Sequence, residues 1–224
     1  MTIFSRVTAI AVAAALFAIV PAVRAQQEFP PPQGTGRLVV LASGMSGPEH
    51  YTEVAADIAK LGYDVVLFDG NAEEGTQGKG VKRDIDKART MPHALPGKVA
   101  LVGFSLGGGM DLYYGTQLTD DVAGVVVWFP ANSFIKDVPG FANRVQVPLV
   151  VFAGGKDHFR DNCCTADRDT TLQQAAKSAG KSFELTVYAD ANHDFSKGGN
   201  NYNAKDYEDG LQYTADALKT FLGN

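Results

Sequence analysis

The sequence predicts an α/β fold in which a mostly parallel sheet carries helices on both faces. Short apolar, β-branched runs occur at residues 37–42, 63–68, 98–102, 123–129, 147–153 and 183–188. They are apolar almost throughout, as expected of strands that are buried on both faces. Segments with helical spacing alternate with them, at residues 50–61, 81–90, 106–118, 165–179 and 204–222. This alternation favours a parallel sheet, and ligands bind such sheets beyond the carboxyl ends of the strands.

The first 25 of the 224 residues have the pattern of a secretory signal peptide. Arg6 gives a basic start, residues 7–20 are apolar, and Val23-Arg24-Ala25 forms a small-residue end. A membrane anchor is the alternative, but the apolar part is shorter than the roughly 20 residues that span a bilayer. We therefore expect a periplasmic or secreted protein with no stable membrane association once the signal is removed.

The rest of the chain reads as a short leader followed by one domain. Residues 26–36 contain three consecutive prolines and two glycines, so an extended, unpacked leader is expected there. Residues 37–224 are enough for a single domain with a sizeable core. Residues 70–80, GNAEEGTQGKG, form a biased segment for which a mobile or solvated loop is expected.

The charge balance and the two cysteines bear on which partners and cofactors can be expected. Twenty basic residues stand against 25 acidic ones; the first 25 residues hold two of the basic ones, which leaves the rest with a formal charge of −7. That balance gives no reason to expect a nucleic-acid partner. The two cysteines, Cys163 and Cys164, are adjacent, so a vicinal disulfide, a local loop clasp or two free thiols are all open. Nothing else resembles a metal or redox motif, and neither a metal nor a cofactor is predicted.

The clearest motif lies in residues 101–109, LVGFSLGGG, where residues 103–107 fit the pattern G-x-S-x-G. A strand is expected before it and a helix after it, the context in which this pattern forms a sharp turn that exposes a nucleophilic serine. The flanking glycines suit that turn because a side chain there would collide with the returning backbone. A dinucleotide-binding G-x-G-x-x-G pattern is not supported, since Phe104 and Ser105 stand where its second glycine should be.

A nucleophilic serine requires a histidine to take its proton and a carboxylate to orient that histidine. His193, in YADANHDF, follows the last expected strand, from which the base comes in an α/β-hydrolase fold. Asp157, in VFAGGKDHF, directly follows the strand at 147–153. The chain order Ser105, Asp157, His193 is that of the α/β-hydrolase triad. Asp161 is the second choice for the acid.

The other titratable residues near these motifs suit different roles. His50 lies near a helix start and His93 in a connection, where histidines are commonly at the surface. His158 directly follows the candidate acid. Asp190 and Asp194 are closer to His193 in sequence, but they suit capping or solvation of their loop.

An oxyanion hole requires a second backbone N–H besides that of Leu106, which opens the helix after the serine. The loop at residues 43–47, SGMSG, follows the first expected strand, and its glycines let the backbone approach a substrate. Met45 is the predicted second donor, with Gly44 as the alternative. A plain glycine turn without a catalytic role is the other interpretation of this loop.

Together, the elbow VGFSLGGG, the acid loop VFAGGKDHF and the histidine loop YADANHDF resemble the dienelactone hydrolase family of the α/β-hydrolases. With DIDKA from Asp84, the resemblance covers most of the chain after residue 25. It implies hydrolysis of an ester or lactone without a cofactor. Members that cleave dienelactone typically carry cysteine at the elbow and an acidic residue near the end of the first strand, whereas this chain has Ser105 and Ser43-Gly44. A broader serine esterase is therefore the better prediction.

We thus expect a serine hydrolase that cleaves small-molecule carboxylic esters or lactones through an acyl-enzyme. The alternatives are an acyltransferase or peptidase on the same triad, or a non-catalytic binding module with a hydrolase fold. Residues 130–146 are too few for a large lid, so an open cleft is expected. Four aromatic residues could line it or could equally well belong to the core: Trp128, Phe129, Phe134 and Phe159.

Overall fold

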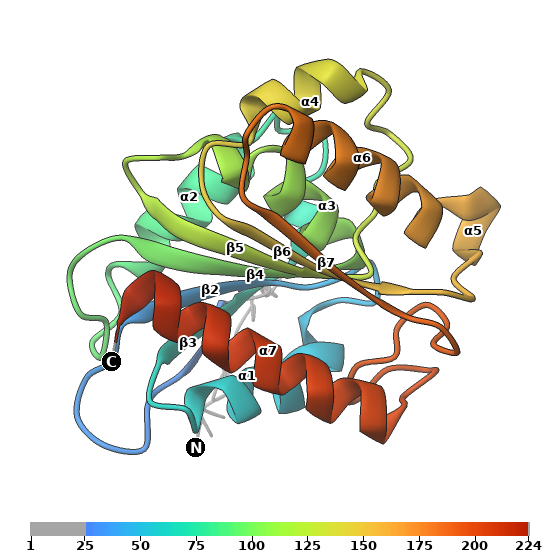
Figure 1. Ribbon diagram of the computed structural model, residues 1–224. Coiled ribbons are helices and arrows are strands. Elements are labelled where there is room, and N and C mark those ends of the chain that lie inside the picture. The colour runs from blue at the N-terminus through green and yellow to red at the C-terminus, as the bar shows by residue number, and fades with distance from the viewer. Residues whose placement is uncertain (1–25, 224) are drawn as a thin grey trace, which may run out of the picture.

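The computed structural model describes residues 26–223; the expected signal segment, residues 1–25, lies outside them, as does Asn224. Seven strands form one sheet in the order β1-β3-β2-β4-β5-β6-β7 (Figure 1). The strands are β1 Gln27–Phe29, β2 Leu38–Ala42, β3 Asp64–Phe68, β4 Val99–Phe104, β5 Val122–Trp128, β6 Leu149–Gly154 and β7 Phe183–Tyr188. All neighbouring pairs are parallel except β1 and β3. This is the mostly parallel sheet that the alternating pattern predicts.

Helices cover both faces of the sheet (Figure 1). One face carries α1 Thr52–Ala59 and α7 Ala204–Leu222. The other carries α2 Lys79–Ala88, α3 Ser105–Tyr113, α4 Val138–Arg144 and α6 Ala166–Ser178. Short turns complete the chain: η1 Pro48–Tyr51, η2 Gly70–Ala72, η3 Gly115–Gln117 and α5 Phe159–Asn162. None of the helices in residues 26–223 is long and apolar enough to cross a membrane.

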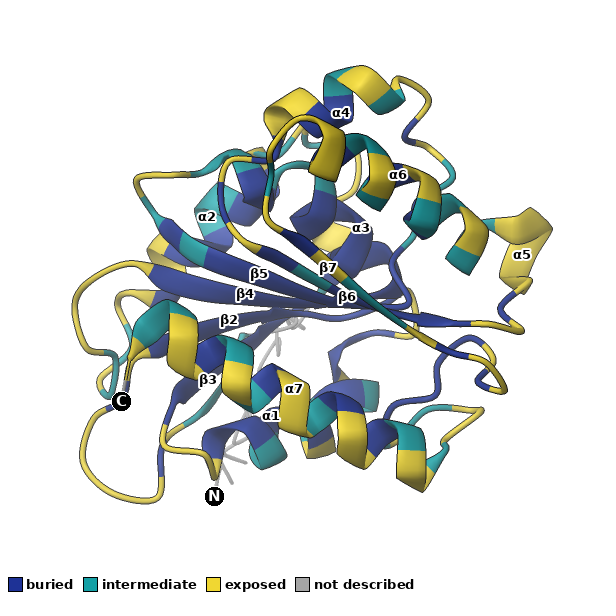
Figure 2. Cartoon of the chain, in the orientation of Figure 1, coloured by how far each residue is buried: buried dark blue, intermediate teal, exposed yellow. Residues whose placement is uncertain are grey.

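The central strands are buried on both faces, which explains their nearly continuous apolar sequence (Figure 2). Successive side chains of a strand point to opposite faces. In β2, Val39 belongs to the core cluster that includes residues of α1 and α7, whereas Val40 belongs to the cluster that includes residues of α2 and α3. Trp128 is the largest buried side chain, and a Cβ at Gly210 of α7 would lie 2.5 Å from its ring. A glycine is therefore needed where α7 meets β5.

Two predictions about connecting segments are wrong. Residues 26–36 are not an unpacked leader, because Gln27–Phe29 pair antiparallel with β3 as β1. A run of three residues before prolines is too short to show the alternation that identifies a strand. Residues 70–80 are not simply a solvated loop: Gly70–Ala72 form a turn, Glu73 is fully buried, and α2 already begins at Lys79.

The segment between β5 and β6 contains one short helix, α4, which packs against α6 on the sheet face that also carries α2 and α3. Within residues 26–223 no large lid covers the carboxyl edge of the sheet, as predicted. The carboxyl ends of β4, β6 and β7 lie at that edge.

Candidate active site

Ser105 stands at the turn between β4 and α3, with a backbone φ of 47° in the left-handed region. This conformation is strained for a residue with a side chain, and it is the one expected at the sharp turn of a G-x-S-x-G motif. Close packing on both sides sustains it. A Cβ at Gly103 would lie 2.6 Å from the Cα of Gly108, and one at Gly107 would lie 2.6 Å from the carbonyl oxygen of Ser43. Glycine is therefore required at both positions.

The structure brings together the three residues predicted as a triad. Oγ of Ser105 lies 3.0 Å from Nε2 of His193, and Nδ1 of His193 lies 2.7 Å from Oδ2 of Asp157. All three are buried, and each follows the carboxyl end of a different strand. A hydroxyl, an imidazole and a carboxylate linked in this order can move a proton away from the hydroxyl as it attacks.

Neighbouring groups hold Asp157 and His193 in place. Oδ1 of Asp157 accepts a hydrogen bond from the backbone N–H of Phe159 at 3.0 Å. The side-chain amide of Asn201 donates to the carbonyl of His193 at 2.7 Å. The rings of Phe129 and Phe159 lie against the imidazole, with centroids 5.1 and 4.4 Å from its own. These contacts restrict rotation of the imidazole and leave its Nε2 directed at Ser105.

A cleft of about 310 Å³ includes Ser105 and His193. Its other lining residues are Met45, Ser46, Tyr51, Phe159, Arg160, Asp194, Asn200 and Asn201. Nη1 of Arg160 lies 3.6 Å from Sδ of Met45, so these two side chains meet in the lining. Arg160, Asp161 and Asn162 all have positive φ, a backbone path that no sequence signal indicates. Sequence reasoning accordingly missed Arg160 and Tyr51.

The structure decides between the two roles left open for the four aromatic residues. Of these four, only Phe159 lines the cleft. Trp128 and Phe129 are buried in the core, although the ring of Phe129 packs edge-on against the imidazole of His193. Phe134 is partly exposed and packs on Tyr113 instead.

The two predicted oxyanion donors belong to segments that adjoin Ser105. Leu106 is in the first turn of α3, where helix N–H groups have no partner in a preceding turn. Met45 lines the cleft. A Cβ at Gly44 would lie 3.1 Å from the Cβ of Ser105, so the backbone of this loop passes directly beside the nucleophile. Glycine at position 44 thus allows a close approach, which a plain turn would not require.

The remaining candidates from the sequence lie away from the Ser105–His193 contact. Asp161, the alternative acid, is exposed. Asp190 forms a surface ion pair with Lys156 at 2.7 Å. His50 is partly buried and lies 3.0 Å from Asp194, a carboxylate at the rim of the cleft. These pairings leave Asp157 as the carboxylate that contacts His193.

Cys163 and Cys164 are joined by a disulfide. Cys164 is fully buried, and its Sγ lies within 4.8 Å of an oxygen of Asp157 and of a ring nitrogen of His193. The carbonyl of Cys163 accepts hydrogen bonds from the backbone N–H groups of Asn132 and Ser133 at 2.8 and 3.0 Å. The closed ring therefore links the acid loop to the segment after β5 and packs against the acid–base pair.

Three buried acids interact with one another, and one of them reaches the turn that carries Ser105: Glu73, Asp84 and Asp111. Asp84 is paired with Arg83 at 2.8 Å. A Cβ at Gly103 would lie 2.6 Å from Oδ2 of Asp111, so this carboxyl group touches the turn itself. Burial raises the pKa of Asp111 and of Glu73 well above the usual range, and repulsion between neighbouring acids adds to both shifts. Asp111 and Glu73 are thus protonated well above the pH at which exposed carboxyls ionise.

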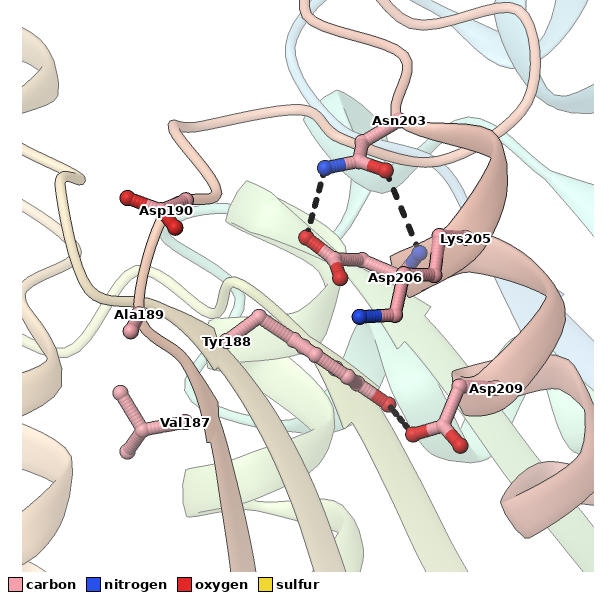
Figure 3. Close-up of a pocket in the computed structure, with 8 residues that line it drawn as sticks. All are labelled: Val187, Tyr188, Ala189, Asp190, Asn203, Lys205, Asp206 and Asp209. Carbon is pink, nitrogen blue, oxygen red and sulfur yellow. Dashed lines mark hydrogen bonds between the residues drawn. The ribbon is translucent and has the colours of Figure 1, made fainter.

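A second pocket, of about 430 Å³, lies between the end of β7 and α7 (Figure 3). Several of its polar groups form hydrogen bonds with one another that stabilise the local structure. Oδ1 of Asn203 accepts a hydrogen bond from the N–H of Asp206 at the start of α7, and the hydroxyl of Tyr188 donates to Asp209 at 2.9 Å. Its lining contains neither a histidine nor a serine. Of these two pockets, only the cleft at Ser105 contains a hydroxyl group in contact with an imidazole.

Comparison with solved structures supports the fold. A dienelactone hydrolase candidate from Klebsiella pneumoniae subsp. pneumoniae has a TM-score of 0.70 and 16% identity, covering 88% of this chain and 98% of its own. Esterase 2 of Thermogutta terrifontis, phosphorylated by paraoxon, has a TM-score of 0.68 and 15% identity, covering 88% of each chain. An esterase of Pyrococcus furiosus has a TM-score of 0.69 and 16% identity, covering 89% and 93%. At these identities the likeness shows the fold, and the prediction of an α/β-hydrolase fold is confirmed.

A search of curated proteins finds no match. The family model described as "Dienelactone hydrolase family" matches residues 68–222, well over half of the chain. That range contains the elbow, the acid loop and the histidine loop that suggested the resemblance. The chain therefore belongs to the dienelactone hydrolase family.

Proposed function

We propose that the protein hydrolyses carboxylic esters or lactones of small molecules with Ser105 as the nucleophile. The observation that carries this proposal is the pair of contacts at 3.0 and 2.7 Å that link Ser105 to His193 and His193 to Asp157. Family membership supports ester hydrolysis as the class of reaction.

In the proposed mechanism, Oγ of Ser105 attacks the ester carbonyl while His193 takes its proton. Asp157 holds the imidazole and stabilises the imidazolium. The backbone N–H groups of Leu106 and Met45 stabilise the oxyanion. His193 then gives the proton to the leaving alcohol, and a water molecule, activated by the same imidazole, releases the acid from the acyl-enzyme. In a lactone the alcohol and the acid remain parts of one product.

The cleft favours compact substrates. Its volume of about 310 Å³ is at the lower end for small-molecule sites, and no large lid among the described residues adds apolar surface for a long acyl chain. The related esterase of Thermogutta terrifontis reacts with paraoxon. By analogy, we expect paraoxon to phosphorylate Ser105 in this protein.

Covalent labelling tests the proposal. The full chain is treated with a fluorophosphonate probe or paraoxon, and the adduct is located by intact-mass and peptide mass spectrometry. A single adduct on Ser105, absent from Ser105→Ala, is expected together with hydrolysis of short-chain esters. Esterase activity at wild-type level in folded Ser105→Ala would contradict the proposal. Folded wild-type protein that neither reacts nor hydrolyses any ester would favour a binding module, and acyl transfer to added alcohols or amines in preference to water would favour an acyltransferase.

We also propose that residues 1–25 direct export and are removed. The basic start, short apolar core and small-residue end of this segment support the proposal. Expression of the full chain in a Gram-negative host followed by cell fractionation tests it. A mature protein that begins near Gln26 is expected in the periplasm or the medium, and full-length protein in the cytoplasm would contradict it.

A further inference from the structure

Three metal-ligating side chains meet at the β1 edge of the sheet. They are Glu28 of β1, Asp64 at the start of β3, and His93 in the connection between α2 and β4. A ligand atom of each lies within 4.8 Å of those of the other two. Nδ1 of His93 lies 3.0 Å from Oε1 of Glu28. Asp64 begins its strand at the end opposite to the carboxyl ends that carry the triad, so this cluster is separate from the active site.

Asp64 is the unusual member of the cluster. It is fully buried, and neither oxygen of its carboxyl group accepts a hydrogen bond from an N–H or hydroxyl group of the described residues; the carboxyl group of Glu28 is its one neighbour within hydrogen-bonding reach among them. A buried carboxylate without a partner is costly, so it requires a proton or a cation nearby. Glu28 lies opposite Val66 in the β1–β3 register, which makes Asp64 its diagonal neighbour on the same face of the sheet. Two carboxyl groups thus face one another next to an imidazole.

The backbone holds the three residues together. The N–H of Gly36 donates to the carbonyl of His93 at 3.0 Å, and the N–H of Leu95 donates to the carbonyl of Gly36 at 2.9 Å. A Cβ at Gly36 would lie 2.7 Å from the backbone nitrogen of Asp64. Gly36 therefore packs against both the His93 connection and the start of β3. The ligand set is built on fixed backbone rather than on a free loop.

We propose that Glu28, Asp64 and His93 bind one zinc ion, which stabilises the pairing of β1 with β3. An imidazole nitrogen with two carboxylate oxygens suits zinc, whereas calcium and magnesium favour oxygen ligands alone. Two ligand atoms that are each about 2 Å from a tetrahedral ion lie roughly 3.3 Å apart. Because the three ligand atoms already lie within 4.8 Å of one another, each needs to move by about 1 Å or less to bind the ion. His93 is 41% exposed and leaves room for a water ligand. This proposal does not depend on the catalytic one.

Zinc titration of the full chain, prepared without an affinity tag and freed of metal with a chelator, tests the site. Isothermal titration calorimetry should give one zinc per chain. Asp64→Asn, which keeps the shape of the side chain, and His93→Asn, at a partly exposed position, should each weaken binding more than tenfold. Glu184→Gln on β7, an exposed carboxylate at the other sheet edge, is the matched control and should bind as wild type does.

Hydrogen exchange gives a second readout. Zinc should slow amide exchange in Gln27–Phe29 of the wild type and leave it unchanged in His93→Asn. Zinc bound equally well by wild type and His93→Asn would assign the metal to another histidine and overturn the proposal. Absence of zinc binding by folded wild-type protein would also overturn it, and would mean that a proton shared by the two carboxyl groups compensates Asp64.

Discussion

The ring of Phe159 lies parallel to the imidazole of His193, with centroids 4.4 Å apart and planes 4° apart. The same residue donates its backbone N–H to Asp157. Phe159 therefore contacts His193 through its ring and Asp157 through its backbone. This double contact makes it a positioning residue for the proposed acid–base pair.

We expect Phe159→Ala to lower kcat/KM for a short-chain ester by about 3- to 10-fold, because aromatic pairs contribute about 0.5–1.5 kcal/mol beyond area burial. The rate of fluorophosphonate labelling of Ser105 should fall in parallel. Phe134→Ala is the matched control, since both phenylalanines are 39% exposed but Phe134 packs on Tyr113. Equal effects of the two substitutions would contradict a positioning role for Phe159.

Asp157→Asn should lower kcat by about 10⁴-fold, because the amide no longer stabilises the imidazolium or holds the required tautomer. Asp161→Asn is the control, because that carboxylate is exposed and the sequence makes it the second choice for the acid. It should change kcat less than twofold. Steady-state kinetics of both variants, with circular dichroism to verify folding, would identify the acid. A large loss in Asp161→Asn alone would exchange the two assignments.

The proximity of Ser105, His193 and Asp157 could be predicted because each of these residues follows a strand in a recognisable local sequence. Ser105 has its glycines, Asp157 directly follows β6, and His193 lies between the last strand and the last helix. Strand order then brings the three carboxyl ends to one edge. This prediction needs only the elements and their order, which hydrophobic periodicity supplies.

Other parts of the site depend on contacts that periodicity does not encode. Arg160 enters the cleft in a stretch where three successive residues adopt positive φ, which is uncommon for residues with a side chain even though aspartate and asparagine adopt it more readily than most. Cys164 lies beside Asp157 because the short segment Phe159–Asn162 turns the chain back on itself. β1 forms because the sheet offers an unpaired edge at β3, not because three residues have strand propensity. Such features are set by tertiary packing, so the sequence alone leaves them open.

The buried acids predict how stability depends on pH. Asp111 and Glu73 have a raised pKa in the folded protein, so the folded state holds more protons than the unfolded state above pH 4. By linkage, the free energy of unfolding then falls as the pH rises from the usual carboxyl pKa towards the raised one. The stability contributed by these protonated acids is thus full below the usual carboxyl pKa and is lost as the pH rises through their raised pKa.

Asp111→Asn should reduce this loss, since the amide stays neutral at every pH. We expect the variant to gain about 1–3 kcal/mol relative to wild type at pH 8, the range for one buried unsatisfied group, and less at pH 5. Urea unfolding at the two pH values measures the difference. Asp120→Asn, at an exposed position, should leave the pH dependence unchanged. An Asp111→Asn curve parallel to that of wild type would contradict the assignment.

The disulfide between Cys163 and Cys164 should support catalysis, because the buried Cys164 packs against Asp157 and His193. Opening the ring frees the short segment that also carries Phe159 and Arg160. Misplacement of a catalytic group by about 1 Å can cost about 100-fold in rate, so even a partial relaxation should be measurable. We expect reduction with a phosphine to lower kcat by about 3- to 10-fold, within the limit that such misplacement allows.

The double variant Cys163→Ser, Cys164→Ser separates this effect from any other action of the reductant. It should have the lowered kcat of the reduced wild type, and added phosphine should not change it further. A thiol assay should find no free thiol before reduction of the unfolded wild type and two after it. Full activity of the double variant would mean that the disulfide only clasps its loop, because the hydrogen bonds of Asp157 would then hold the acid without it.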